Sequence, residues 1–183
     1  MTYYGPKEMA ASFRTVRGNT INIAEEIPEE NYTFRPAPGC RSIAETLIHI
    51  ALGVRLQEQV HVTEHRDTLV GFDFFAFMGK MAAEEQTPRT KAAILDLLRL
   101  EGEKYAQILE GLTEPFLGEM VQYPQGMVPP AKSRFEMLIA PKEHEMHHRG
   151  QLMQTQRMLG MVPPLTRHMQ ERIAALKAAA QQA

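Results

Sequence analysis

Apolar residues recur at steps of three and four along most of this chain, and that spacing constrains its fold more than any other feature. Met9, Phe13, Val16, Thr20 and Ile23 would share one face of a helix from Lys7 to Glu26. The same spacing, with start and stop signals, predicts a second helix from Ser42 to near His61, a third from Thr87-Pro88 to about Leu109, a fourth from Ser133 to about Leu159, and a fifth from Thr166. No strand is predicted.

The segments between these helices are long. Residues 27–42 hold three prolines and a glycine, so we expect an ordered connector that Tyr32 and Phe34 attach to the core. "FDFFAFMGKMAAEEQ" is too short and too aromatic for a main helix and is interpreted as a connection with a short helical turn. The sequence therefore predicts an all-α fold: one domain over residues 1–183, a four-helix bundle with long connections and an additional C-terminal helix.

Composition narrows the possible functions. The 20 Lys and Arg residues are balanced by 22 Asp and Glu, so no basic field is available to bind nucleic acid. Cys40 is the only cysteine, which excludes an internal disulfide and fits a reducing compartment. We find no signal peptide and no apolar run of the roughly 20 residues that a bilayer requires, so we expect a soluble, cytoplasmic protein without membrane partners.

The segment "EHEMHHRGQL", residues 143–152, places three histidines within five positions. Four residues of helix turn about 400° and rise about 6 Å, so His144 and His148 point the same way, one turn apart. Two such imidazoles can share a metal ion. His147 is offset by about 100° and is less well aimed. The alternative interpretation is a cluster of surface or capping histidines.

A third ligand can come from His49, which follows apolar neighbours in the second helix. An imidazole buried there without a partner is costly. It can be satisfied within the core, or it can share an ion with the pair on a facing helix, a common arrangement in bundles. We predict that His49, His144 and His148 bind one divalent metal ion.

These segments also carry a resemblance. "RPAPGCRSIAETLIHI" followed by "EHEMHHRGQL" resembles the DinB/YfiT-like family of metal-dependent four-helix bundles over nearly the whole chain. The resemblance implies a homodimer, metal ligands at the three histidines just named, and nickel or zinc as the ion, with iron or manganese as alternatives. Some members of that family are similar to thiol S-transferases that use a low-molecular-weight thiol, and others to maleylpyruvate isomerases.

Three imidazoles leave positions open on a divalent ion, which can activate a water or bind a thiolate. We therefore expect a metal-dependent transferase or hydrolase acting on a small molecule. The alternative is a non-catalytic metal- or ligand-binding bundle, which a fourth protein ligand such as Glu45 or His147 would favour. The catalytic residues are not identified. Gln151 and Glu45 are candidates to support the site, although an interhelical hydrogen bond and the Ser42 capping box are their simpler roles.

Other polar residues are expected to be uninvolved. Cys40 lies roughly 13 Å from His49 by helical rise and is interpreted as an incidental thiol. The spacing of the remaining residues predicts a close helix approach at Gly150, solvated side chains at Glu143 and Glu145, and surface or loop positions for His61, His65 and His168.

Overall fold

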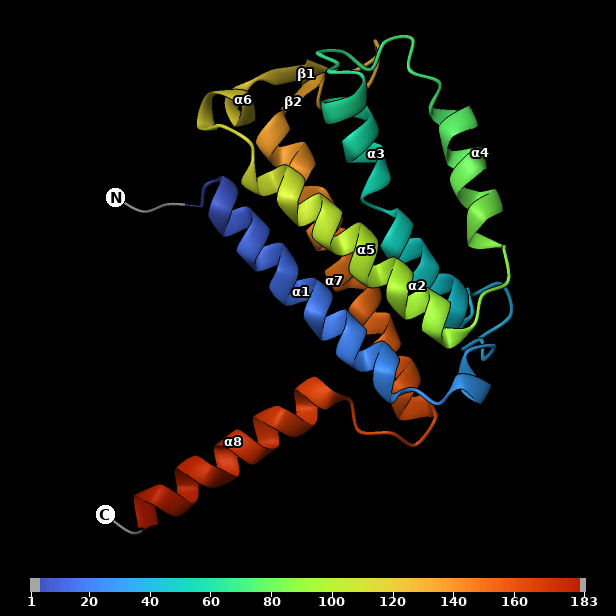
Figure 1. The fold of residues 1–183 in the computed structure, drawn as a ribbon, viewed down its shortest axis with the longest axis vertical. Helices are drawn as coiled ribbons and strands as arrows, with labels where there is room; N and C mark the ends of the chain where they lie inside the picture. The colour runs from blue at the N-terminus through green and yellow to red at the C-terminus, as the bar shows by residue number, and fades with distance from the viewer. Residues whose placement is uncertain (1–3, 182–183) are drawn as a thin grey trace.

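Four long helices form the bundle that the sequence predicts (Figure 1). The computed structural model describes residues 4–181. Helices α1 and α2 each pack against both α5 and α7. The bounds are α1 Pro6–Glu26, α2 Ile43–Leu52, α5 Lys91–Glu110 and α7 Arg134–Met158.

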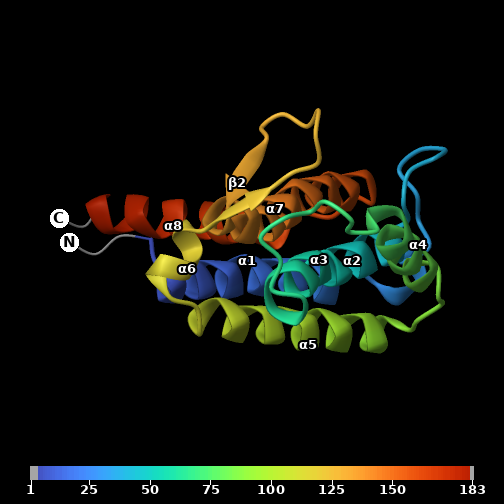
Figure 2. The same cartoon turned by 90° about the horizontal axis from the view of Figure 1, so that it is seen from above.

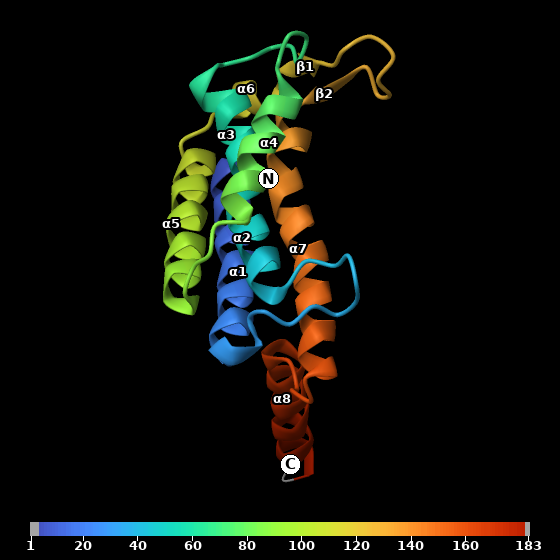
Figure 3. The ribbon, with the colours of Figure 1, turned by 90° about the vertical axis from the view of Figure 1, so that its right-hand side faces the viewer.

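Shorter elements connect and extend the bundle. A two-stranded antiparallel hairpin precedes α7, with Val121 paired to Lys132. Its connecting loop stands out from the helices in Figure 2, and α8 runs away from the bundle in Figure 3. These elements are the 3₁₀ turn Glu29–Asn31, α3 Arg55–Glu58, a π-helical turn Gln59–Thr63, α4 Phe74–Glu85, α6 Glu114–Gly118, β1 Met120–Gln122, β2 Ala131–Ser133 and α8 Pro164–Gln181.

The core consists of apolar side chains at helical spacing. Around α2, Leu47, Ile94 and Leu98 are fully buried. Toward the other end of α1, Phe13 packs edge-on against Tyr105 with ring centroids 5.0 Å apart. The predicted connector is ordered as expected, because the Tyr32 hydroxyl donates to the Ala24 carbonyl at 2.7 Å.

The local signals hold at several helix ends. Ser42 accepts from the Glu45 N–H, and Glu45 reaches back to the Ser42 N–H, so the predicted capping box is present. Ser133 caps α7. Gly160, with φ of +76°, follows the end of that helix in the left-handed conformation that glycine tolerates.

Four sequence predictions were wrong in detail. The second helix does not continue to His61, because α2 ends before Gly53 and α3 follows. Helix α5 begins after Thr90, whose side chain caps it, and not at Thr87. The short hairpin was not predicted. The aromatic segment forms the 12-residue helix α4, capped by Asp73 and packed against α2.

Among residues 4–181, no helix combines the length and apolar character needed to cross a bilayer.

Candidate metal centre

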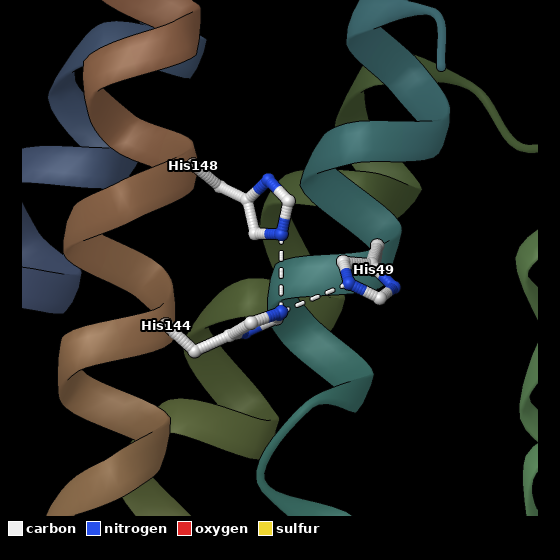
Figure 4. Close-up of side chains that lie close together, drawn as sticks. All are labelled: His49, His144 and His148. Atoms are coloured by element: carbon white, nitrogen blue, oxygen red, sulfur yellow. Dashed lines mark hydrogen bonds between the residues drawn. The ribbon is translucent and has the colours of Figure 1, made fainter. Parts of the chain in front are cut away.

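His49, His144 and His148 lie together, as predicted, between α2 and α7 (Figure 4). Nε2 of His144 is 3.0 Å from Nε2 of His49 and 3.0 Å from Nε2 of His148. The potential ligand atoms of all three lie within 4.8 Å of one another. Two segments separated by almost a hundred residues thus bring three nitrogens to one point.

The outer ring nitrogens fix two of the tautomers. The Glu85 carboxylate lies 2.9 Å from Nδ1 of His49, and the Gln151 amide oxygen lies 2.8 Å from Nδ1 of His148. Both oxygens are acceptors, so each Nδ1 carries the proton. The Nε2 lone pairs of His49 and His148 therefore point inward.

Burial keeps these rings neutral. Burial, with a smaller contribution from the neighbouring imidazoles, lowers the pKa of His144 to about 4. The pKa values of His49 and His148 are also lowered, chiefly by burial. In His49, Arg41 adds to this effect and Glu85 opposes it. Neutral imidazoles are the form that binds metal ions.

This arrangement fits a metal ion. The Nε2 lone pairs of His49 and His148 both face Nε2 of His144. A proton on that nitrogen can be donated to only one of them, whereas a cation can accept a lone pair from all three nitrogens at once. A nitrogen 2.0–2.1 Å from an ion can be no more than about 4.2 Å from a second such nitrogen. The two Nε2–Nε2 separations of 3.0 Å lie within that limit, and all the potential ligand atoms lie within 4.8 Å of one another, close to the spacing that an ion requires. The cluster can therefore hold a metal ion.

Gly53 makes room for the third ring. A methyl group added there would lie 3.3 Å from Nδ1 of His144 and 3.3 Å from the His49 carbonyl oxygen. The break between α2 and α3, which the sequence did not predict, thus occurs where His144 approaches α2.

Comparisons with known proteins identify the family and the fold of this chain. The sequence matches the DinB family over residues 1–178. The chain belongs to the DinB family. It is 26% identical to the uncharacterized protein YjoA of Bacillus subtilis strain 168 over 157 residues, which is 84% of this chain and 90% of YjoA. The crystal structure of that DinB-like protein superposes with a TM-score of 0.63 at 25% identity, covering 85% of this chain and 93% of YjoA.

The acceptor for His49 was not predictable from this DinB sequence. Glu85 is 8% exposed and is bound by both His49 and the Arg41 guanidinium. It lies on α4, the segment interpreted as a connection, and no sequence spacing links it to His49. Its position depends on how α4 packs against α2.

Of the two residues proposed to support the site, Gln151 contacts a histidine of the cluster and Glu45 is engaged elsewhere. Gln151 contacts His148, and its amide nitrogen lies 3.0 Å from Nε2 of His147. Glu45 instead completes the Ser42 capping box and forms an ion pair with Arg35, which is its simpler predicted role.

Three predictions about nearby residues were wrong. Glu145 is not solvated: it is 1% exposed and pairs with Arg17 at 3.0 Å. His61 is buried between Gln57 and Arg134. A methyl group at Gly150 would meet nothing within 4 Å beyond its own helix backbone, so no helix in the described part of the chain approaches closely there.

Proposed function

We propose that this DinB protein is a metal-dependent enzyme that activates a water or a low-molecular-weight thiol toward a small molecule, in the manner of a thiol S-transferase or a hydrolase. His49, His144 and His148 would hold one divalent ion, nickel or zinc first, with iron or manganese as alternatives. When bound, the ion would supply Lewis acidity and a position for an exchangeable ligand.

The observation that carries the proposal is that, among residues 4–181, three ligand nitrogens and no fourth protein ligand converge on one point. Structural zinc sites usually have four protein ligands, whereas catalytic sites keep a position open. The candidates for a fourth ligand are engaged elsewhere, Glu45 with Arg35 and His147 with Gln151. An open position favours catalysis over a purely structural ion.

The chain's own residues would orient the ligands and admit the substrate. Glu85 and Gln151 hold the His49 and His148 rings with their lone pairs inward. Beside His148 lies a pocket of about 840 Å³, here called the connector pocket, which Arg41 and Gln151 also line. Pockets of about 300–1,000 Å³ hold whole small-molecule ligands, so this space has room for a substrate beside the cluster.

The alternative function is a non-catalytic bundle that binds a metal ion or another ligand. It would bind the same ion through the same three histidines but show no reaction that depends on them. Measuring the metal content therefore does not distinguish the two proposed functions, whereas measuring catalytic turnover does.

Elemental analysis and a thiol-transfer screen test the proposal. The purified protein should retain about one divalent ion per chain, and the His49→Ala/His144→Ala/His148→Ala variant should retain none. His168→Ala, at an exposed position, is the control. The metal-loaded protein is then assayed with several low-molecular-weight thiols and generic electrophiles. Equal metal content in wild type and the triple variant would refute the site, and equal rates for wild type and His49→Ala would refute catalysis there.

We also propose that the protein acts in the cytoplasm as a homodimer, with a small-molecule substrate and without nucleic acid or membrane partners. Helix α8 extends from the bundle and exposes Met169, Ile173 and Leu176 at helical spacing, which favours this face as the dimer contact.

A further inference from the structure

The three-histidine cluster borders two pockets of different chemistry. His148 lines the connector pocket, whereas His49 and His144 line a second pocket of about 250 Å³. Glu85 lines both. A molecule reacting at the cluster can therefore extend in two directions, and the smaller space is called the α4 pocket here.

The walls of the α4 pocket are mostly apolar. Glu85 at its edge is already bound by Arg41 and His49, and the Gln57 amide oxygen lies 3.0 Å from the ring of His61. A charged group entering this space would lose hydration, and the side chains of the described lining residues offer it no free counter-charge, which is costly. The apolar wall residues include Leu52, Leu56, Phe74, Phe77, Met78 and Met81.

Two of these apolar wall residues are partly exposed to solvent. Phe74 is 47% exposed and Met78 is 38% exposed, although both are large apolar side chains. Both lie on α4, which contacts the bundle chiefly through α2. An apolar group bound against them would remove that surface from water, and aromatic and thioether side chains also favour an aromatic guest.

The volume limits the guest. Pockets that hold a whole drug-sized ligand measure about 300–1,000 Å³, so a space of about 250 Å³ takes one arm of a molecule. A single aromatic ring or a short branched alkyl group is the appropriate size.

We propose that the α4 pocket is a specificity subsite that binds an uncharged aryl or branched alkyl arm of the substrate, whose reacting end lies at the histidine cluster. Phe74 and Met78 determine this preference. The inference rests on the proposed function, because it assumes that the cluster is the reacting centre.

The first test measures binding to the cobalt-loaded protein. Acetohydroxamic acid and benzohydroxamic acid offer the same ligand group, with a methyl or a phenyl arm, and visible absorption of Co²⁺ follows both titrations. Wild type should bind the phenyl compound about tenfold more tightly, since the ring leaves water. Phe74→Ala/Met78→Ala should reduce this ratio to near one, and Ala140→Leu, which fills the pocket from α7, should do the same.

The matched control is Phe75→Ala. Phe75 follows Phe74 on the same helix but is 87% exposed and does not line the pocket, so the ratio should stay at its wild-type value. A ratio near one in wild type, or a wild-type ratio in Phe74→Ala/Met78→Ala, overturns the subsite.

A second measurement separates the subsite from the proposed function. Saturation-transfer NMR on the metal-free protein compares benzyl alcohol with 1-propanol. If wild type contacts benzyl alcohol and Ala140→Leu abolishes that contact, the subsite is supported. If neither hydroxamate perturbs the Co²⁺ spectrum, only the open metal site is overturned. No contact in wild type overturns the subsite.

Discussion

The carboxylate of Glu85 lies 2.9 Å from Nδ1 of His49, and the same side chain is bound by Arg41. A helix outside the four-helix bundle therefore sets the tautomer of a residue inside it. This carboxylate–histidine pair is the usual arrangement around metal-ligating imidazoles.

Removing the charge of Glu85 should weaken metal binding. In Glu85→Gln the amide can present its nitrogen to His49 and no longer enforces the inward lone pair, so we expect metal affinity to fall roughly 10–100-fold. Competition with a chromophoric chelator measures this. Glu84→Gln makes the same change one residue earlier, where the carboxylate pairs with Arg55 and Arg89, and should leave the affinity unchanged.

A methyl group at Gly53 should displace the His144 ring. We expect Gly53→Ala to lower metal affinity while the bundle stays folded, because the added carbon would lie 3.3 Å from Nδ1 of His144. Gly150→Ala is the comparison, since its methyl meets nothing within 4 Å. That variant should gain up to about 1 kcal/mol in the free energy of unfolding and keep its metal affinity.

The buried pair between Arg17 and Glu145 should matter for stability. Glu145→Ala leaves a guanidinium buried without its counter-charge and should lower the free energy of unfolding by about 3–5 kcal/mol, measured by urea denaturation. Arg17→Met/Glu145→Leu removes both charges and should cost less. Glu143→Ala, at an exposed position on the same helix, should change stability by less than about 0.5 kcal/mol. Equal losses in Glu145→Ala and Glu143→Ala would contradict this expectation.

His61 should make the metal-free protein sensitive to acid. Arg134 can only donate to Nδ1, and burial followed by the charge of Arg134 lowers the His61 pKa from 6.5 to about 4. Below pH 6.5 His61 is protonated in the unfolded chain but stays neutral in the folded protein. The free energy of unfolding therefore falls as the pH drops from about 6.5 to about 4. The total loss from this residue is about 3 kcal/mol.

The variant His61→Gln keeps an acceptor for Arg134 but cannot titrate. Urea midpoints measured between pH 7 and pH 4 should fall less steeply for it than for wild type. Identical slopes would show that His61 is not the group responsible.

The exposed face of α8 predicts the oligomeric state. Ile173→Glu places a charge among Met169 and Leu176 and should convert the proposed dimer to a monomer, as measured by light scattering after size exclusion. Ala178→Glu introduces the same side chain at an exposed position on the opposite face of the same helix and should leave the mass unchanged. A wild type that is monomeric would contradict the homodimer.

Local sequence signals were sufficient to predict that the three histidines come together, but not to predict the residues that surround them. His144 and His148 are one turn apart on any helix, and the Ser42 capping box places His49 on a second helix. The partners of these residues lie far away in sequence: Glu85 is 36 residues from His49, and Arg17 is 128 residues from Glu145. Only the packed structure shows which charges meet.

The error at α4 has a different origin. Phe74, Phe77, Met78 and Met81 recur at helical spacing, and Asp73 precedes them as a cap, so the local signal for a helix is present in the sequence. The segment was interpreted as a connection because it is short and aromatic. Its contact with α2 is evident only once the chain is folded.

Helix α4 contributes a partner for His49 and one wall of a pocket, yet most of its surface faces water and the buried core is built by other helices. Mutations along its outer turns can therefore accumulate with little penalty to folding. In related proteins we expect this stretch to diverge sooner than the histidines, so that one unchanged reactive centre serves different compounds in different organisms.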